Sequence, residues 1–258
     1  MPETRPSRRT GAPTNPPVDA EQGPSSHAQP PIEAASSTSS RPYQGERARH
    51  LIAVDRDAPL ARFDWDGIFG RRNRVEFEIG SGKGLFLANA ALSNRDRDFV
   101  GVEVSRKYAE FAALRLAKRG IENARIVLGD ARTVIEQGIP DRGLAAVHVY
   151  FPDPWWKTRH RKRRVMNEWL LDQFERVLEP GGEFFFATDV AEYFAVVERL
   201  MAGRPRFVRA PWREAVDPEL ASAGLTSFER KYRVQGRSIH RARYVLANQG
   251  GGVEAMSS

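Results

Sequence analysis

The chain has 258 residues, of which 41% are hydrophobic and 28% are charged, a composition typical of a soluble globular protein with one sizeable α/β domain. It contains no cysteine, which excludes disulfides, thiolate metal ligands and any reaction that depends on a cysteine nucleophile. The net charge is +7 at pH 7, which favours an acidic partner such as nucleic acid.

The two ends of the chain differ in composition from the middle. Residues 1–45 are rich in Pro, Ser, Gly, Ala and Gln, which predicts a disordered tail, and residues 249–258 predict a second flexible end. We therefore expect one folded domain at 46–248. No run of apolar residues is long enough to span a membrane or to form a secretory signal, so we expect a cytoplasmic protein. The histidines lack the spacing of metal ligands, and we expect no metal site.

Short β-rich runs alternate with helical patterns along that domain. The predicted strands are 75–79, 98–104, 124–130, 144–151 and 183–189. The predicted helices are 85–92, 108–119, 165–178 and 190–202, with a short helix after residue 130. Residues 206–247 are predicted to form a strand, a loop and a strand. This alternation predicts an α/β fold, a doubly wound and mostly parallel sheet with helices on both faces.

A glycine-rich loop follows the first predicted strand and opens the first helix. It reads Glu78-Ile-Gly80-Ser-Gly82-Lys-Gly84, and glycines there allow a sharp turn and a close approach of a ligand to the backbone. The dinucleotide fingerprint needs a further glycine where the chain has Leu85. S-adenosylmethionine carries a sulfonium and an ammonium rather than phosphates, so a carboxylate at Glu78 suits it.

Two more acids stand at strand ends. Glu103 ends the second strand, where an acid accepts hydrogen bonds from ribose hydroxyls, and Asp130 follows the third, within reach of an adenine amino group. Three acids at the carboxyl ends of three strands predict a cofactor pocket. Acids at these places also serve as helix caps, and the sequence leaves that alternative open.

The segment after the fourth strand carries the residues most suited to chemistry on a base. Asp153 stands between two prolines, which stiffen its loop, and Trp155 and Trp156 offer flat faces for an unstacked base. Lys157 adds a cation for a phosphate or a guanine oxygen. Residues 157–164 contain six Lys and Arg side chains and no acid, which predicts contact with a nucleic-acid backbone, although a merely solubilising loop has the same composition.

These residues together resemble the bacterial tRNA (guanine-N7-)-methyltransferases. The resemblance covers roughly residues 70–247 and rests on EIGSGKG, GVEV, the F-P-D-P-W-x-K-x-R-H-x-K-R-R signature at 151–164, the PGG turn, ATD at 187–189 and the T-S-F-E run at 226–229. The 151–164 signature is highly specific, whereas the glycine loop is common to the whole methyltransferase superfamily. Trp156 stands at a position that varies in the family, and Ser227 replaces a frequent lysine.

The resemblance implies a seven-stranded Rossmann-like sheet and transfer of a methyl group from S-adenosylmethionine to N7 of a guanosine in the variable loop of tRNA. It implies Asp153 as the active-site residue and no metal, in a monomer or a homodimer. The implied cofactor residues are Glu78, Gly80, Gly82, Gly84, Glu103, Asp130 and Asp153. The implied guanosine contacts are Lys157, Asp189, Thr226, Ser227, Phe228 and Glu229. The implied RNA contacts are Arg159, His160, Arg161, Lys162, Arg163 and Arg164.

The same residues also allow other interpretations of the sequence. Thr226 and Glu229 also match a helix capping box, which the pattern by itself favours. An exocyclic-amine methyltransferase carries an Asp/Asn-Pro-Pro-aromatic loop in the same place, but here the loop reads Asp153-Pro154-Trp155 and lacks the second proline. A non-catalytic RNA-binding protein with a degenerate fold is disfavoured because each acid of the pocket is present. An NAD-dependent enzyme is disfavoured by the missing glycine.

Overall fold

A computed structural model describes residues 44–55, 57–155, 159, 164–217 and 226–248. The two predicted tails, 1–45 and 249–258, lie almost entirely outside these ranges, so their disorder and the boundaries of the folded domain stay predictions.

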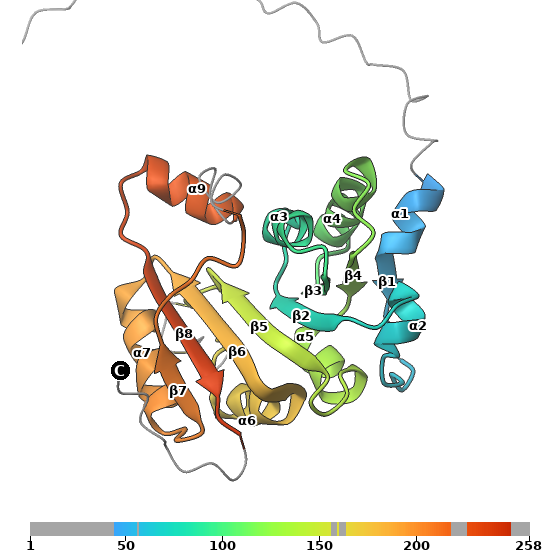
Figure 1. The fold of residues 1–258 in the computed structure, drawn as a ribbon. Helices are drawn as coiled ribbons and strands as arrows, with labels where there is room; N and C mark the ends of the chain where they lie inside the picture. The colour runs from blue at the N-terminus through green and yellow to red at the C-terminus, as the bar shows by residue number, and fades with distance from the viewer. Residues whose placement is uncertain (1–43, 56, 156–158, 160–163, 218–225, 249–258) are drawn as a thin grey trace, which may run out of the picture. The chain divides into compact units, whose positions relative to one another are not determined.

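One mixed sheet organises the described residues (Figure 1). Its strands are β1 (Leu51–Ala53), β2 (Arg74–Ile79), β3 (Arg97–Glu103), β4 (Ala124–Leu128), β5 (Leu144–Tyr150), β6 (Leu178–Thr188), β7 (Phe207–Ala210) and β8 (His240–Leu246). They lie in the order β1-β4-β3-β2-β5-β6-β8-β7. The pairs from β1 to β6 are parallel, and β8 is antiparallel to both β6 and β7. The predicted fold class is confirmed, but the sheet has an eighth strand because β1 adds itself to the edge beside β4.

Helices cover both faces of this sheet (Figure 1). They are α1 (Gln44–His50), α2 (Trp65–Phe69), α3 (Leu85–Ser93), α4 (Arg106–Lys118), α5 (Ala131–Thr133), a π-helix (Val134–Gly138), α6 (Glu168–Val177), α7 (Ala191–Ala202) and α9 (Ser227–Val234). The apolar residues of α3 and α4 belong to one buried cluster, and those of α6 and α7 belong to the other.

The alternation of side chains along the central strands explains why two clusters form. In β6, Phe184 packs into the cluster beneath α6 and α7, whereas Phe185 packs into the cluster beneath α3. In β5, Val147 and Ala146 divide in the same way, and all four side chains are at most 1% exposed. A parallel sheet buried on both faces leaves the ends of its strands as the place for a binding site.

The strand order also locates that place. From β2 the chain moves outward through β3 to β4, and it then returns to the middle of the sheet, so that β5 pairs with β2 on its other side. In open α/β sheets, ligands bind outside the carboxyl ends of the strands at such a reversal. The carboxyl ends of β2 and β5 therefore mark the candidate site.

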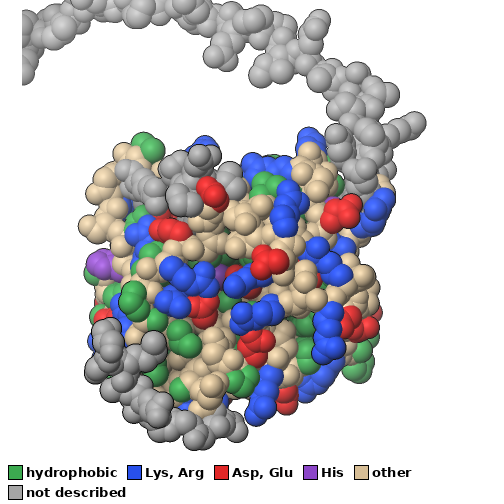
Figure 2. Space-filling view, viewed as in Figure 1, with side chains coloured by type: hydrophobic (Ala, Val, Ile, Leu, Met, Phe, Trp, Pro, Cys, Tyr) green, Lys and Arg blue, Asp and Glu red, His purple; other side chains and the backbone are tan. Residues whose placement is uncertain are grey.

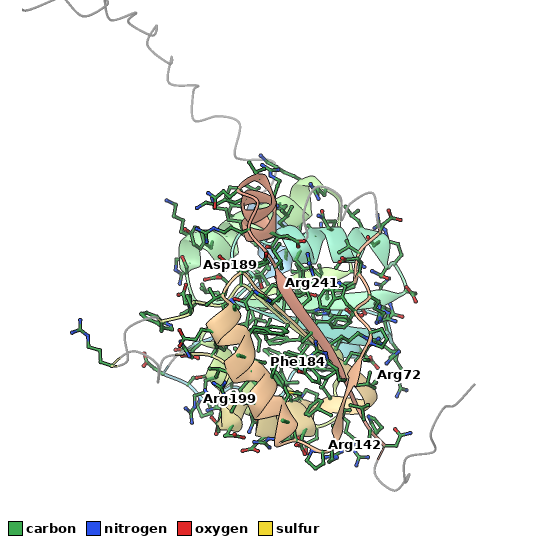
Figure 3. All side chains as sticks on the ribbon, turned by 90° about the vertical axis from the view of Figure 1, so that its left-hand side faces the viewer. Arg72, Arg142, Phe184, Asp189, Arg199 and Arg241 are labelled. Atoms are coloured by element: carbon green, nitrogen blue, oxygen red, sulfur yellow. The ribbon has the colours of Figure 1, made fainter. Side chains whose placement is uncertain are left out.

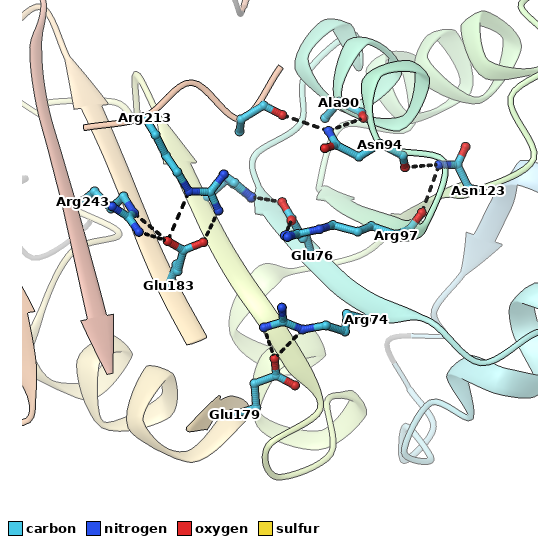
Figure 4. A network of polar contacts seen from close by, with 12 residues as sticks. Arg74, Glu76, Ala90, Asn94, Arg97, Asn123, Glu179, Glu183, Arg213 and Arg243 are labelled. Atoms are coloured by element: carbon cyan, nitrogen blue, oxygen red, sulfur yellow. Dashed lines mark hydrogen bonds and ion pairs between the residues drawn. The ribbon is translucent and has the colours of Figure 1, made fainter. Parts of the chain in front are cut away.

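Ion pairs join strands that are far apart in the sequence (Figure 4). Arg74, at the start of β2, pairs with Glu179 of β6, and Glu183 of β6 pairs with Arg213 and with Arg243 of β8. Burial acts to raise the pKa of Glu183, but the hydrogen bonds and charges of the two arginines outweigh it and lower the pKa. This carboxylate therefore stays ionised between two cations and ties β6 to β8.

Gly84, at the end of the glycine loop, is a position where a side chain does not fit. Its φ is +66°, in the left-handed region, and a Cβ built on it would lie 2.7 Å from Cβ of Ala112 in α4. A Gly84→Ala change therefore combines backbone strain of roughly 1–2 kcal/mol with an overpacking cost of typically about 1–3 kcal/mol.

We expect Gly84→Ala to lower the free energy of unfolding in urea by more than Gly70→Ala. Gly70 is the matched control because its φ is +67° but nothing lies within 4 Å of its Cβ position, so it carries the strain without the clash. Equal losses in the two variants would show that the contact with Ala112 is relieved without cost.

Candidate active site

Three of the acids predicted from the sequence lie at one edge of the sheet. Glu78 stands near the end of β2, Glu103 is the last residue of β3, and Asp130 follows β4 by two residues. Because β2, β3 and β4 are neighbouring parallel strands, their carboxyl ends lie side by side. The structure thus brings these three residues together as expected, at the point where the strand order reverses.

The glycine loop forms a tight turn over this edge. The backbone N–H groups of Gly80 and Ser81 both donate to the carbonyl of Val102 in β3, at 3.0 and 3.1 Å. Gly80, Gly82 and Gly84 have φ angles of 77°, 53° and 66°, which residues other than glycine rarely adopt. The spacing of the three glycines therefore reflects three left-handed positions, and the loop is held against β3.

Glu103 and Asp130 both accept hydrogen bonds from the backbone. The carboxylate of Glu103 accepts from the N–H groups of Gly82 and Ser105, each at 2.8 Å, and so fixes the glycine loop. Two bonds leave half of its acceptor sites for ribose hydroxyls. Oδ1 of Asp130 accepts from the N–H of Arg132 at 2.7 Å and caps α5. The capping alternative is therefore correct for Asp130, whose side chain is nonetheless exposed at the site.

Glu78 differs from the other two acids because it is buried and incompletely paired. It is 4% exposed, and among the described residues its Oε2 atom has no hydrogen-bond partner. Burial, together with the charge of Glu103, raises the pKa of Glu78 to about 8. A buried carboxylate oxygen with open acceptor capacity beside the glycine loop fits a cationic ligand such as S-adenosylmethionine, whose ammonium would supply the missing donor.

A cavity of about 560 Å³ lies at the carboxyl ends of β1, β3 and β4. Its lining includes Val104, which follows Glu103, and Gly129, which precedes Asp130, but neither acid itself lines it. The volume is in the range of small-molecule sites. Asp55 and Asp57 also line the cavity, and the sequence analysis missed them. The signal was present, since an apolar run at residues 51–54 precedes them as in the other strand-to-acid junctions.

The loop that carries Asp153 begins at the same edge, because β5 and β2 are paired neighbours. Its backbone is unusual: Phe151 and Trp155 have φ angles of 49° and 43°, and the N–H of Phe151 donates to the carbonyl of Ala187 at 2.8 Å. The side chain of Asp153 is exposed. Strained residues in a short loop are typical of functional sites, where the surroundings hold them in place.

Arg164, at the end of the basic segment, points into the protein. It is 7% exposed, its Nε donates to the carbonyl of Pro154 at 2.7 Å, and its guanidinium lies 4.8 Å from the ring centroid of Tyr193 in α7. These contacts indicate that Arg164 holds the Asp153 loop, while its RNA contact stays a prediction without structural support. Arg159 is exposed. Outside the described part of the chain lie the side chains of Trp156, Lys157, His160, Arg161, Lys162, Arg163, Ser227 and Phe228.

Two of the remaining predicted guanosine contacts form ion pairs with arginines. Asp189, after β6, pairs with Arg237 at 2.7 Å, and Glu229 of α9 pairs with Arg241 of β8 at 2.5 Å. Figure 3 shows Asp189 and Arg241 at the end of the sheet nearest α9. Oγ1 of Thr226 accepts from the N–H of Glu229 at 3.0 Å, so the capping alternative is correct for this hydrogen bond. Glu229 is 1% exposed and Thr226 is 9% exposed, which limits their access to a substrate.

A buried chain of hydrogen bonds reaches the same edge through the sheet. Glu76 of β2 lies 2.8 Å from Nε2 of His148 in β5, whose Nδ1 lies 2.9 Å from the hydroxyl of Tyr150. The other oxygen of Glu76 pairs with Arg97. Burial, followed by the charge of Glu78, raises the pKa of Tyr150 well above its usual range, so the hydroxyl stays protonated. Nothing in the sequence indicates this chain, because its members are joined only by strand pairing.

The described residues contain no group of three or more His, Asp or Glu side chains that could hold a metal ion. None of their helices combines the length and the apolar character that crossing a membrane requires.

Comparison with known proteins gives consistent results. A family described as "Putative methyltransferase" matches residues 72–242. A tRNA (guanine-N(7)-)-methyltransferase of Rhodopirellula baltica is 41% identical over 183 residues, which cover 69% of this chain and 68% of that protein. A protein of the same name from Syntrophotalea carbinolica is 37% identical over 199 residues, 74% of this chain and 85% of its own.

Solved structures support the fold. The 16S rRNA methyltransferase KamB superimposes with a TM-score of 0.53 at 16% identity and covers 76% of this chain and 99% of its own. The aminoglycoside resistance methyltransferase NpmB1 gives a TM-score of 0.50 at 17% identity, with 74% and 95% covered. At these identities the likeness concerns the architecture alone.

Proposed function

The chain belongs to the tRNA (guanine-N(7)-)-methyltransferase family, and from that premise we propose that it transfers a methyl group from S-adenosylmethionine to N7 of a guanosine in tRNA. The family relation supports the reaction and the cofactor. The observation in the structure that supports it best is the buried, open carboxylate of Glu78 beside the glycine loop. We place the target guanosine in the variable loop and the enzyme in the cytoplasm, as a monomer or a homodimer without metal.

The cofactor site follows from the residues at the sheet edge. S-adenosylmethionine, when bound, supplies a methyl group on a cationic sulfonium, and transfer forms the N7–carbon bond, breaks the sulfur–carbon bond and moves the positive charge to the purine. Glu78 would hold the ammonium, and Glu103 would accept from the ribose hydroxyls while it keeps the glycine loop in place. Asp130, which follows Gly129 of the cavity lining, would reach the adenine.

The residues of the Asp153 loop act on the guanine. N7 carries an in-plane lone pair and no proton at neutral pH, so the protein needs no base there, and catalysis comes mainly from alignment. Asp153 is exposed at the sheet edge, and we propose that its carboxylate stabilises the positive charge that develops on the purine ring. Asp189, whose side chain is 9% exposed, accepts from Arg237 through Oδ2, and we keep it as the candidate that would hold a donor of the base through Oδ1. Burial of Glu229 makes it a support for α9 rather than a direct contact.

The proposed reaction is tested by the product. Purified full-length protein is incubated with methyl-labelled S-adenosylmethionine and bulk tRNA from a strain that lacks N7-methylguanosine, and the tRNA is then digested and analysed by mass spectrometry. We expect label in N7-methylguanosine from the variable loop. Label on an exocyclic amine would identify the alternative methyltransferase. Cofactor binding in a calorimeter without any transfer would identify a non-catalytic RNA-binding protein.

A further inference from the structure

Cationic and aromatic side chains gather on the outer face of α4, beside the glycine loop. Tyr108 and Phe111 of α4 are 43% and 46% exposed, which is unusual for two large rings one turn apart. Nζ of Lys83, in the glycine loop, lies 5.8 and 5.6 Å from the two ring centroids. The guanidinium of Arg115 lies 5.5 Å from the ring of Phe111. Each ring is therefore exposed and bordered by a cation.

Two more arginines extend this surface toward α9. Arg119 donates to Asn89 of α3 at 3.0 Å, and Arg230 is exposed on α9. Partial burial, followed by the charges of Arg119 and Arg230, lowers the pKa of Arg115, so the three guanidinium groups repel one another. Figure 1 shows α9 on the same side of the molecule as α3, with α4 beyond α3. We call this surface the α4–α9 patch: Lys83, Tyr108, Phe111, Arg115, Arg119 and Arg230.

The chemistry of the patch defines its partner. Clustered cations are stabilised by an anion, and exposed rings between cations offer stacking platforms for unpaired bases. Figure 2 shows Lys and Arg side chains together with hydrophobic side chains over the ends of α3 and α4. Glu110, the acid on the same helix, pairs with Arg106 at 3.9 Å. A phosphate backbone with at least one unstacked base matches both features, and a purely protein partner matches only the rings.

We propose that the α4–α9 patch is a second tRNA-binding surface, which holds the phosphate backbone and an unstacked base of the substrate at a distance from the target guanosine. The inference rests on the proposed function, because it takes tRNA as the substrate. Lys83 belongs both to the glycine loop and to the patch, so RNA on this surface reaches the cofactor edge without a gap. The 151–164 segment contacts the target, and the patch orients the body of the molecule.

The test measures tRNA affinity in two variants of the full-length chain. Tyr108→Ala combined with Phe111→Ala removes the stacking platforms and should weaken binding of an unmodified tRNA transcript by roughly 5- to 150-fold, with an unchanged salt dependence. Arg115→Gln removes one phosphate contact and should reduce the slope of log K against log salt by about 0.7–0.9. Calorimetric binding of S-adenosylmethionine should equal that of the wild type in both variants.

Two control variants lie away from the patch. Arg199→Gln removes an exposed arginine of α7, which covers the other face of the sheet (Figure 3). Val208→Ala truncates a side chain of β7 that is 53% exposed. Both should bind tRNA as the wild type does. The inference is overturned if the patch variants bind tRNA within twofold of the wild type, or if sedimentation shows that they change only the oligomeric state. Failure of the wild type to methylate bound tRNA would instead refute the proposed function and leave the binding result standing.

Discussion

Replacing Asp153 by asparagine should reduce turnover with saturating tRNA by roughly 10²–10³-fold, the usual effect of losing one electrostatic contact to a transition state. The amide keeps the size of the side chain and removes its charge. Because N7 of guanine becomes cationic during transfer, a neutral side chain at this position loses an attraction that grows along the reaction coordinate. The loop itself should not move, since the N–H of Phe151 donates to the carbonyl of Ala187 and the side chain of Arg164 donates to the carbonyl of Pro154.

The affinities for tRNA and for S-adenosylmethionine distinguish transition-state stabilisation by Asp153 from a role in substrate binding. Dissociation constants for tRNA and for S-adenosylmethionine should stay within about threefold of the wild type, because a contact that strengthens only in the transition state affects turnover and not ground-state binding. Asp66→Asn, in the exposed first turn of α2, is the matched control for loss of one surface carboxylate and should leave turnover unchanged. Unaltered turnover in Asp153→Asn would remove Asp153 from the mechanism.

The central sheet was predictable from the sequence because each inner strand is buried on both faces. Runs such as residues 144–150 are almost continuously apolar, and only a buried parallel strand accommodates them at that length. β1 escaped prediction because it has three residues and is stabilised by a partner more than seventy positions away. The helix α9 was missed although Thr226 gives a capping signal, because charged residues in its first turns interrupt the apolar pattern.

Local signals also misplaced some boundaries. The helix predicted at 165–178 begins only at Glu168, because Oδ1 of Asn167 accepts from the N–H of Leu170 at 3.0 Å and caps it there. The strand predicted at 183–189 begins five residues earlier, at Leu178, which pairs with Leu144 across an irregular register. In both places a tertiary contact or a cap sets the boundary, and hydrophobic periodicity does not report it.

The position of the strand-end acids in the fold was predictable from the sequence, but their contacts were not. Strand-end acids are visible in a sequence, whereas the burial of Glu78 depends on neighbours from other strands. The cap formed by Asp130 is local, but its residue type alone does not distinguish a cap from a ligand contact. Arg164 illustrates the same limit. A run of cations suggests one shared role, but the packing of α7 places the last of them against Tyr193 and inside the protein.

The unligated protein should lose stability as the pH rises through the range in which Glu78 ionises. Its pKa is raised from an ordinary value near 4.5 to about 8 by burial and by the charge of Glu103. Between these values the folded state retains a proton that the unfolded chain releases, so the free energy of unfolding falls from about pH 4.5 to about pH 8 and then levels off. The shift corresponds to about 3–5 kcal/mol.

Glu78→Gln isolates this effect because the amide is neutral at every pH. In urea unfolding, the free energy of unfolding of Glu78→Gln should rise relative to that of the wild type as the pH rises. Glu136→Gln, which changes an exposed acid of the π-helix, should show the same pH dependence as the wild type. Glu76 does not interfere, since hydrogen bonding and the charges of His148 and Arg97 overcome burial and lower its pKa to about 2, which moves its contribution to acid pH. If the free energies of unfolding of the wild type and of Glu78→Gln changed with pH in the same way, the raised pKa of Glu78 would be contradicted.

Cofactor binding should show the opposite dependence. A cationic ligand favours the ionised carboxylate, so S-adenosylmethionine should bind the wild type more tightly at pH 8 than at pH 6, and at neutral pH binding should release a proton from Glu78. Calorimetry in two buffers with different ionisation enthalpies measures that release directly. Glu78→Gln should bind more weakly and without the proton, because it offers the ammonium no charge. Proton release that persists in the variant would assign the linkage to another group and leave Glu78 without its role as the anchor of the cofactor.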